Sequence, residues 1–129
     1  MRRASLVLLL ALAACDTMIA HRIAITSPAD VSQAGPTQDD VLATVRNTLT
    51  SCELAIVHSS AGSEVWEWRN PEKPPGVQAD VRAGSDLVEN RLSQGLYGPI
   101  GPTEKYLAVK AALVDAATKR VGKGRVRVE

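Results

Sequence analysis

The chain is poor in aromatic residues, with two Trp, two Tyr and no Phe among its 129 residues. This scarcity excludes a core built on aromatic stacking, so the interior must be filled mainly by Leu, Ile, Val and Ala. Hydrophobic residues still make up 45% of the sequence, as in an ordinary globular protein. The composition therefore predicts one folded domain with an aliphatic core.

A charge of one sign does not dominate, because 15 Lys and Arg residues face 14 Asp and Glu residues. Proteins that bind nucleic acid through their net charge are strongly basic, so we expect no nucleic-acid partner. One segment, residues 119–129, departs from this balance, and we call it the basic segment. It contains one acidic residue, Glu129, and five basic residues, which are Lys119, Arg120, Lys123, Arg125 and Arg127.

The sequence also has no glycine-rich phosphate loop and no nucleophile-elbow motif. His21 and His58 are the only histidines, and with Cys52 they have no metal-ligand spacing. We therefore expect no catalytic residues, no metal and no cofactor.

No hydrophobic run near the N-terminus is long enough to span a membrane. The uncharged stretch from Ala4 to Ala14 has about half the required length. It follows Arg2 and Arg3, and its centre is an apolar run of Leu and Val. A short positive segment followed by such a run is typical of a signal peptide.

Leu12-Ala13-Ala14-Cys15 resembles the lipobox of bacterial lipoprotein precursors, in which an aliphatic and two small residues precede a cysteine. The resemblance covers residues 1–16. It implies that the Cys15 thiol carries a diacylglycerol, that signal peptidase II removes residues 1–14, and that residues 15–21 form a lipidated N-terminus and short tether. Two or three acyl chains give a stable anchor. Asp16 resembles the signal that retains lipoproteins in the inner membrane, which we favour over the outer membrane.

If Cys15 is lipidated, Cys52 has no partner for an intrachain disulfide. A lone exported thiol is either buried or paired with another chain. We expect Cys52 to be buried and inert, since free cysteine is among the most buried residue types.

Hydrophobic periodicity predicts an α+β fold over residues 22–129, treated as a single domain. The residues 86–94 fit either a short helix or a strand. We expect two main helices on one face of a mostly antiparallel sheet of four to five strands. The first strand, helix and second strand could form a parallel crossover. The expected strands are 22–26, 54–58, 64–69, 77–82 and 125–128, and the expected helices begin near Thr37 and at Thr103.

Two features are candidates for partner binding. Trp66 and Trp68 share one face of a strand, where they either pack beneath a helix or form an exposed anchor. Leu96, Tyr97 and Ile100 belong to an apolar loop that either closes the core or presents a binding patch.

The leading functional hypothesis is a non-enzymatic accessory lipoprotein of the cell envelope, facing the periplasm, which binds another envelope component through its sheet face and the 96–102 loop. One alternative is an envelope-polymer hydrolase, in which His58, a carboxylate and a hydroxyl converge. Another is a small-ligand carrier with an apolar cavity. Arg125 and Arg127 either contact anionic headgroups or form a solvated basic strand.

Overall fold

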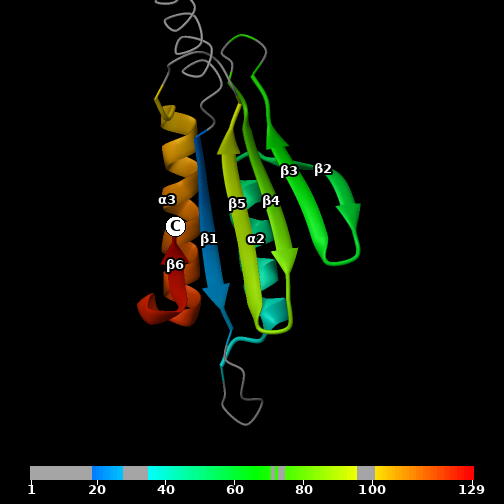
Figure 1. Cartoon of the computed structure of the whole chain (residues 1–129), viewed down its shortest axis with the longest axis vertical. Coiled ribbons are helices and arrows are strands. Elements are labelled where there is room, and N and C mark those ends of the chain that lie inside the picture. The colour runs from blue at the N-terminus through cyan, green and yellow to red at the C-terminus, as the bar shows by residue number, and fades with distance from the viewer. Residues whose placement is uncertain (1–18, 28–34, 71, 73–74, 96–100) are drawn as a thin grey trace, which may run out of the picture.

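The computed structural model describes residues 19–27, 35–70, 72, 75–95 and 101–129. These residues form two layers, a six-stranded sheet and two helices that cover one of its faces (Figure 1). The expected α+β class is confirmed, with a sheet slightly larger than predicted. The elements in chain order are β1 (Ile19–Thr26), α2 (Gln38–Ser51), β2 (Ala55–Ser60), β3 (Ser63–Trp68), β4 (Val77–Ala83), β5 (Leu87–Gln94), α3 (Glu104–Val121), the 3-10 turn η1 (Lys123–Arg125) and β6 (Val126–Val128).

The strand order is β2-β3-β4-β5-β1-β6, and every neighbouring pair is antiparallel. β1 and β2 therefore run in the same direction, but β5, β4 and β3 lie between them. The first β-α-β segment is thus not a crossover between adjacent parallel strands. Helix α2 instead connects β1, the second strand from one edge of the sheet, with β2 at the opposite edge. Helix α3 connects β5 with β6, which lies on the other side of β1.

Helix α2 starts where its capping residues predict. The Thr37 hydroxyl accepts a hydrogen bond from the Asp40 amide at 3.2 Å, and the Asp40 carboxylate accepts one from the Thr37 amide at 2.9 Å. This reciprocal pair satisfies N–H groups that the first helical turn leaves without partners. The face that α2 buries against the sheet consists of Val41, Val45 and Leu49.

Strand β5 resolves the ambiguous segment as a strand rather than a helix. Its inward positions are Val88, Asn90, Leu92 and Gln94, all buried. The Gln94 side chain donates to the Gly101 carbonyl at 3.2 Å and accepts from the Thr103 amide at 2.8 Å. These bonds fix the start of α3, whose buried face then packs against the sheet. That face consists of Tyr106, Val109, Leu113 and Ala117.

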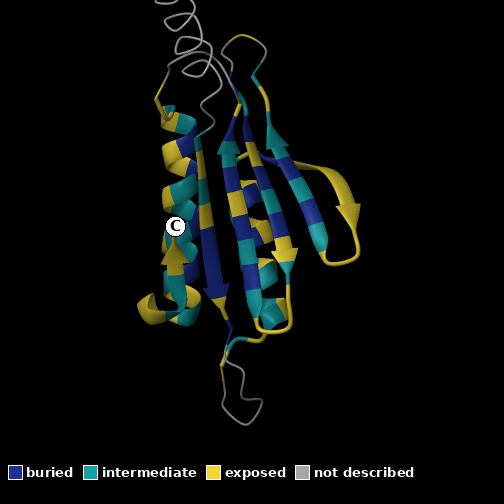
Figure 2. Cartoon of the chain, viewed as in Figure 1, coloured by how far each residue is buried: buried dark blue, intermediate teal, exposed yellow. Residues whose placement is uncertain are grey.

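The core lies between the sheet and the helices, and it is largely aliphatic as the composition predicts (Figure 2). Trp66 and Tyr106 are its aromatic members among the described residues. β1 begins at Ile19, three residues before the expected start of the domain. Its first residue already pairs with Gln94, so the segment between Cys15 and the sheet is shorter than the sequence indicated.

Candidate functional site: a polar hollow on the open face of the sheet

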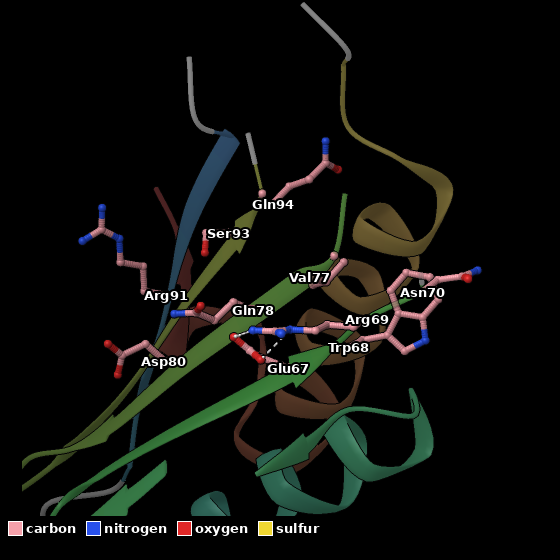
Figure 3. A pocket seen from close by; sticks show the side chains of 12 residues that line it. Glu67, Trp68, Arg69, Asn70, Val77, Gln78, Asp80, Arg91, Ser93 and Gln94 are labelled. Carbon is pink, nitrogen blue, oxygen red and sulfur yellow. Dashed lines mark hydrogen bonds and ion pairs between the residues drawn. The ribbon is translucent and has the colours of Figure 1, made fainter. Parts of the chain in front are cut away.

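The sheet face away from the helices is polar, because alternate residues of β3, β4 and β5 point outward. Glu67 pairs in register with Gln78, and Gln78 pairs with Ser93. In the next outward row, Asp80 pairs with Arg91. Over these rows lies an open hollow of about 750 Å³ (Figure 3). Its lining comes from β3, β4, β5 and the residues that adjoin these strands, and comprises Glu67, Trp68, Arg69, Asn70, Gly76, Val77, Gln78, Asp80, Arg91, Ser93, Gln94 and Gly95.

The hollow carries charges of both signs. Arg69 pairs with Glu67 at 3.0 Å between Nε and Oε2, and Arg82 lies 3.5 Å from the Asp80 carboxylate. Arg91 makes no ion pair within the part of the chain that the structure describes. Solvent-exposed pairs of this kind contribute little to stability. The site therefore offers one available guanidinium among carboxylate, amide and hydroxyl groups, which suits binding of a polar ligand or partner.

Gly76 shapes one wall of the hollow. A Cβ at this position would lie 2.6 Å from the Trp68 carbonyl oxygen, which is too close for any side chain. Its carbonyl accepts a hydrogen bond from the Gly95 amide at 3.1 Å. A glycine here lets the 76–77 backbone approach the end of β3, and this close approach closes one side of the hollow.

The hollow lies at the end of the sheet where β1 begins. Gln94 pairs both with Ile19 of β1 and with Val77 of β4. Figure 1 shows the start of β1 at the same end as the start of α3 and the end of α2. Any tether that precedes Ile19 therefore leaves the domain beside the hollow.

The tryptophan pair faces the helices rather than solvent. Trp66 is 5% exposed in the core, and its indole N–H donates to Glu64 at 3.3 Å. Trp68 is half-buried against the core, with the Lys105 ammonium 5.1 Å above its ring. Of the two arrangements that the sequence left open, the pair therefore adopts the one in which it packs beneath a helix. Trp66 is not accessible to a partner, whereas Trp68 also reaches the rim of the hollow.

Glu64 and Arg46 form an ion pair that joins β3 to α2. The Arg46 guanidinium donates from Nη2 at 2.7 Å and from Nε at 3.1 Å. The hydrogen bond from Arg46 lowers the pKa of the Glu64 carboxyl, against the opposing effect of its burial. Glu64 is thus held ionised inside the helix-covered layer, and it does not face the hollow.

His21, His58 and Cys52 lie in three separate places. His21 contacts the Tyr106 hydroxyl at 2.7 Å, while that hydroxyl donates to the Leu92 carbonyl at 3.2 Å. The Tyr106 hydroxyl thus lies between the His21 ring and the backbone of β5. His58 is exposed on β2. Among the described residues, no group of three or more His, Cys, Asp or Glu side chains could hold a metal ion.

Cys52 caps the C-terminal end of α2 and is half-buried, less than we expected. Burial raises the pKa of its thiol above the usual value. The thiol is then largely protonated at neutral pH, and a protonated thiol is a weak nucleophile.

The basic segment lies at the opposite end of the molecule from Ile19. Arg127 pairs with Ala24 in register, and Arg125 belongs to η1, beyond the end of α3. Several of these charges have acidic neighbours: Lys119 lies 2.9 Å from Asp115, and Arg120 lies 3.6 Å from Asp40. If the chain is anchored ahead of Ile19, this placement counts against contact of Arg125 and Arg127 with the membrane.

Cys15, Leu96, Tyr97 and Ile100 lie outside the described residues. No helix within the described ranges is long and apolar enough to cross a membrane.

The hollow was not predicted from the sequence, because its residues come from three strands whose neighbours in the sheet cannot be read from local patterns. The alternation of polar residues in β4 was the one local signal that pointed to an open face.

No family model matches the chain, and no curated protein matches it.

Proposed function

We propose that the protein is a lipid-anchored accessory protein of the cell envelope that binds another envelope component in the polar hollow. It is held on the membrane through Cys15, faces the periplasm and has no catalytic role. The observation that carries this proposal is the position of the hollow beside the start of β1. Asp16 favours the inner membrane as the site of anchoring.

The distance from Cys15 to the sheet supports a fixed orientation. Four residue steps separate Cys15 from Ile19 and reach at most about 14 Å. A tether of this length keeps the hollow end of the domain near the bilayer. A component at or near the membrane surface is then closer to the hollow than to the opposite end of the domain.

The polar chemistry of the hollow favours this function over the alternatives. It is open and lined by charged and amide groups, unlike the closed apolar cavity of a small-ligand carrier. The histidine that a hydrolase would need is not among its lining residues. His58 pairs with Val65 in register and is separated from Asp80 by that strand.

Anchoring is tested by changing Cys15 to Ala. The variant should take up no labelled palmitate and should keep its full precursor mass, because the acylated thiol is the substrate for processing. Lipid labelling and mass spectrometry of the purified protein measure both. A variant that is still acylated and matured to the same mass would contradict the anchor.

The hollow is tested by Arg91→Gln, with Arg127→Gln as a matched control. Both variants lose the same charge from an exposed arginine, but Arg127 does not line the hollow, and its neighbour Glu129 does not line it either. Quantitative pull-downs from solubilised membranes should recover less of the bound component with Arg91→Gln and unchanged amounts with Arg127→Gln. Equal loss in both variants would indicate a general charge effect and contradict a specific site.

A further inference from the structure

Arg91 is a cation whose acidic neighbours are paired with other residues. On the open face of the sheet these neighbours are Asp80, opposite it on β4, and Glu89, two positions before it on β5. The Glu89 carboxylate forms an ion pair with Arg22, and the Asp80 carboxylate lies 3.5 Å from Arg82. Within the part of the chain that the structure describes, Arg91 therefore has no ion pair, although two carboxylates flank it.

The Asp80 carboxylate is turned away from Arg91. The two residues are directly opposite each other in register, where side chains of opposite charge attract. Figure 3 nevertheless shows the guanidinium and the carboxylate pointing in different directions. The Oδ1 atom of Asp80 is buried and has no hydrogen-bond partner among the described residues. By holding Asp80, Arg82 leaves the Arg91 guanidinium available to an anion from outside the chain.

Polar groups beside Arg91 suit the remainder of such a ligand. Ser93 lies two residues further along the same face of β5, and Gln78 is its cross-strand partner on β4. A hydroxyl and an amide side chain each donate and accept hydrogen bonds, as the hydroxyls of a sugar do. These two groups therefore favour a hydroxylated ligand over an apolar side chain.

The acidic residues of the hollow limit the charge of the anion. Glu67 and Asp80 both belong to the lining. A phosphate monoester carries a charge of about −1.5 to −2 at neutral pH, and these carboxylates would repel it. A carboxylate carries one charge, and its two oxygens match the planar guanidinium of Arg91 in a bidentate contact. The lining therefore favours a carboxylate.

We propose that the hollow binds an acidic sugar, whose carboxylate contacts Arg91 and whose hydroxyls contact Ser93 and Gln78. This ligand class rests on the proposed function, in which a component of the cell envelope binds in the hollow. Arg82 is a positioning residue, because it contacts Asp80 rather than the ligand and holds that carboxylate away from Arg91.

The test is an NMR titration of the isotopically labelled full chain in detergent micelles with galacturonate and with galactose, which has CH2OH in place of the carboxylate. Galacturonate should shift the side-chain signals of Arg91 and Gln78 and the amide signal of Ser93. It should bind about tenfold or more tightly than galactose, because a charged hydrogen-bonded contact is lost in galactose. Absence of galacturonate binding, or equal affinity for both sugars, would overturn the proposal.

Two further probes test the rest of the assignment. Galactose 6-phosphate has the larger charge and should bind more weakly than galacturonate. N-acetyl-alanyl-alanine has a carboxylate but no hydroxyl, and it should also bind more weakly. Tighter binding of the phosphate would overturn the carboxylate, and equal or tighter binding of the dipeptide would overturn the sugar.

Variants separate the roles of the arginines. Arg91→Gln should remove the preference for galacturonate over galactose, whereas Arg127→Gln, which lies outside the lining, should leave it unchanged. Arg82→Gln should weaken galacturonate binding, because Asp80 is then free to pair with Arg91. The double variant Arg82→Gln/Asp80→Asn should restore binding. An effect of Arg82→Gln that persists in the double variant would overturn the positioning role.

The pull-down with Arg91→Gln distinguishes failure of this proposal from failure of the proposed function. Reduced recovery in that variant, without galacturonate binding to the wild type, would overturn the acidic sugar and leave the proposed function intact. Unchanged recovery would contradict the proposed function, and the titration alone would then decide whether an acidic sugar binds in the hollow.

Discussion

Asn90 shows how one buried polar side chain can prevent a strand from being recognised in the sequence. It occupies an inward position of β5, is fully buried, and donates from Nδ2 to the Ile23 carbonyl at 3.4 Å. Because Asn90 and Gln94 are polar, two of the inward positions of β5 break the apolar alternation of a strand. Leu87, Val88 and Leu92 then fitted a helix equally well. The structural role of these amides depends on tertiary contacts, which the local pattern does not contain.

The buried amide of Asn90 leads to a stability prediction. Its Oδ1 atom has no hydrogen-bond partner among the described residues. Leu has the same branching and number of side-chain heavy atoms, so Asn90→Leu should remove a buried polar group without leaving a large void. We expect the free energy of unfolding to rise by about 1 kcal/mol. Urea denaturation measures it, and Asn90→Ala, which leaves a cavity, should lower stability. A less stable Leu variant would mean that the amide is required.

The contribution of Glu64 to the free energy of unfolding depends on pH. Its carboxyl is 11% exposed, and Arg46 lowers its pKa below the ordinary value of 4.5. The ionised form therefore stabilises the fold fully above the unfolded-state pKa, and this contribution is lost as pH falls through the lower folded-state pKa. Glu64→Gln should reduce the free energy of unfolding by about 1–3 kcal/mol at neutral pH.

The difference between wild type and Glu64→Gln should diminish as the pH falls below 4.5, where the carboxyl also becomes neutral. Denaturation curves at several pH values measure this trend. Glu67→Gln is the control, because that carboxylate belongs to an exposed pair on the opposite face. A difference that stays constant with pH would mean that Glu64 contributes by packing alone.

At the scale of elements, the helix starts could be predicted and one helix end could not. Thr37 and Thr103 cap α2 and α3 as expected, because a cap depends only on residues within one turn. α2 ends without glycine. Glu53 adopts a φ of 69°, and the Leu54 amide donates to the Leu49 carbonyl at 3.0 Å. This Schellman arrangement usually uses glycine, so the sequence carried no stop signal there.

The strained end of α2 provides a third stability prediction. A side chain in the left-handed region costs about 1 kcal/mol relative to glycine. Glu53→Gly should therefore raise the free energy of unfolding by up to about 1 kcal/mol, partly offset by greater freedom of the unfolded chain. Glu53→Ala retains a Cβ and should give no such gain. Thermal and urea unfolding measure both variants, and an equal effect of Ala and Gly would assign the change to loss of the Glu53 charge instead.

At the scale of the whole molecule, the sequence predicted the layers but not the sheet order. Amphipathic patterns are local, and they indicated two main helices on one face of a mostly antiparallel sheet. The order β2-β3-β4-β5-β1-β6 places β1 between β5 and β6, which lie far from it in the chain. The hollow depends on that order, and so does its position beside Ile19. Both could therefore be found only after the strands were placed.

If the chain is anchored at Cys15 as proposed, the same topology predicts how the domain stands on the membrane. Glu104 begins α3 at the end of the molecule where β1 starts, and Lys123 follows the other end of that helix. The 18 residues of α3 span about 27 Å. With the anchor at Cys15, residue 104 should lie close to the bilayer and residue 123 should point away from it. This orientation also places the basic segment beyond the Debye length of about 8 Å at physiological salt, where headgroup attraction is weak.

Fluorescence energy transfer to acceptor lipids measures this orientation. The lipidated full chain, with Cys52 changed to Ala, would be labelled at Glu104→Cys or at Lys123→Cys and reconstituted in vesicles. Transfer should be clearly stronger from residue 104, and it should not change when anionic lipid or salt is varied, because the tether rather than charge holds the domain. Stronger transfer from residue 123 that is lost at high salt would contradict this orientation. It would show instead that the basic segment containing Arg125 and Arg127 contacts the headgroups.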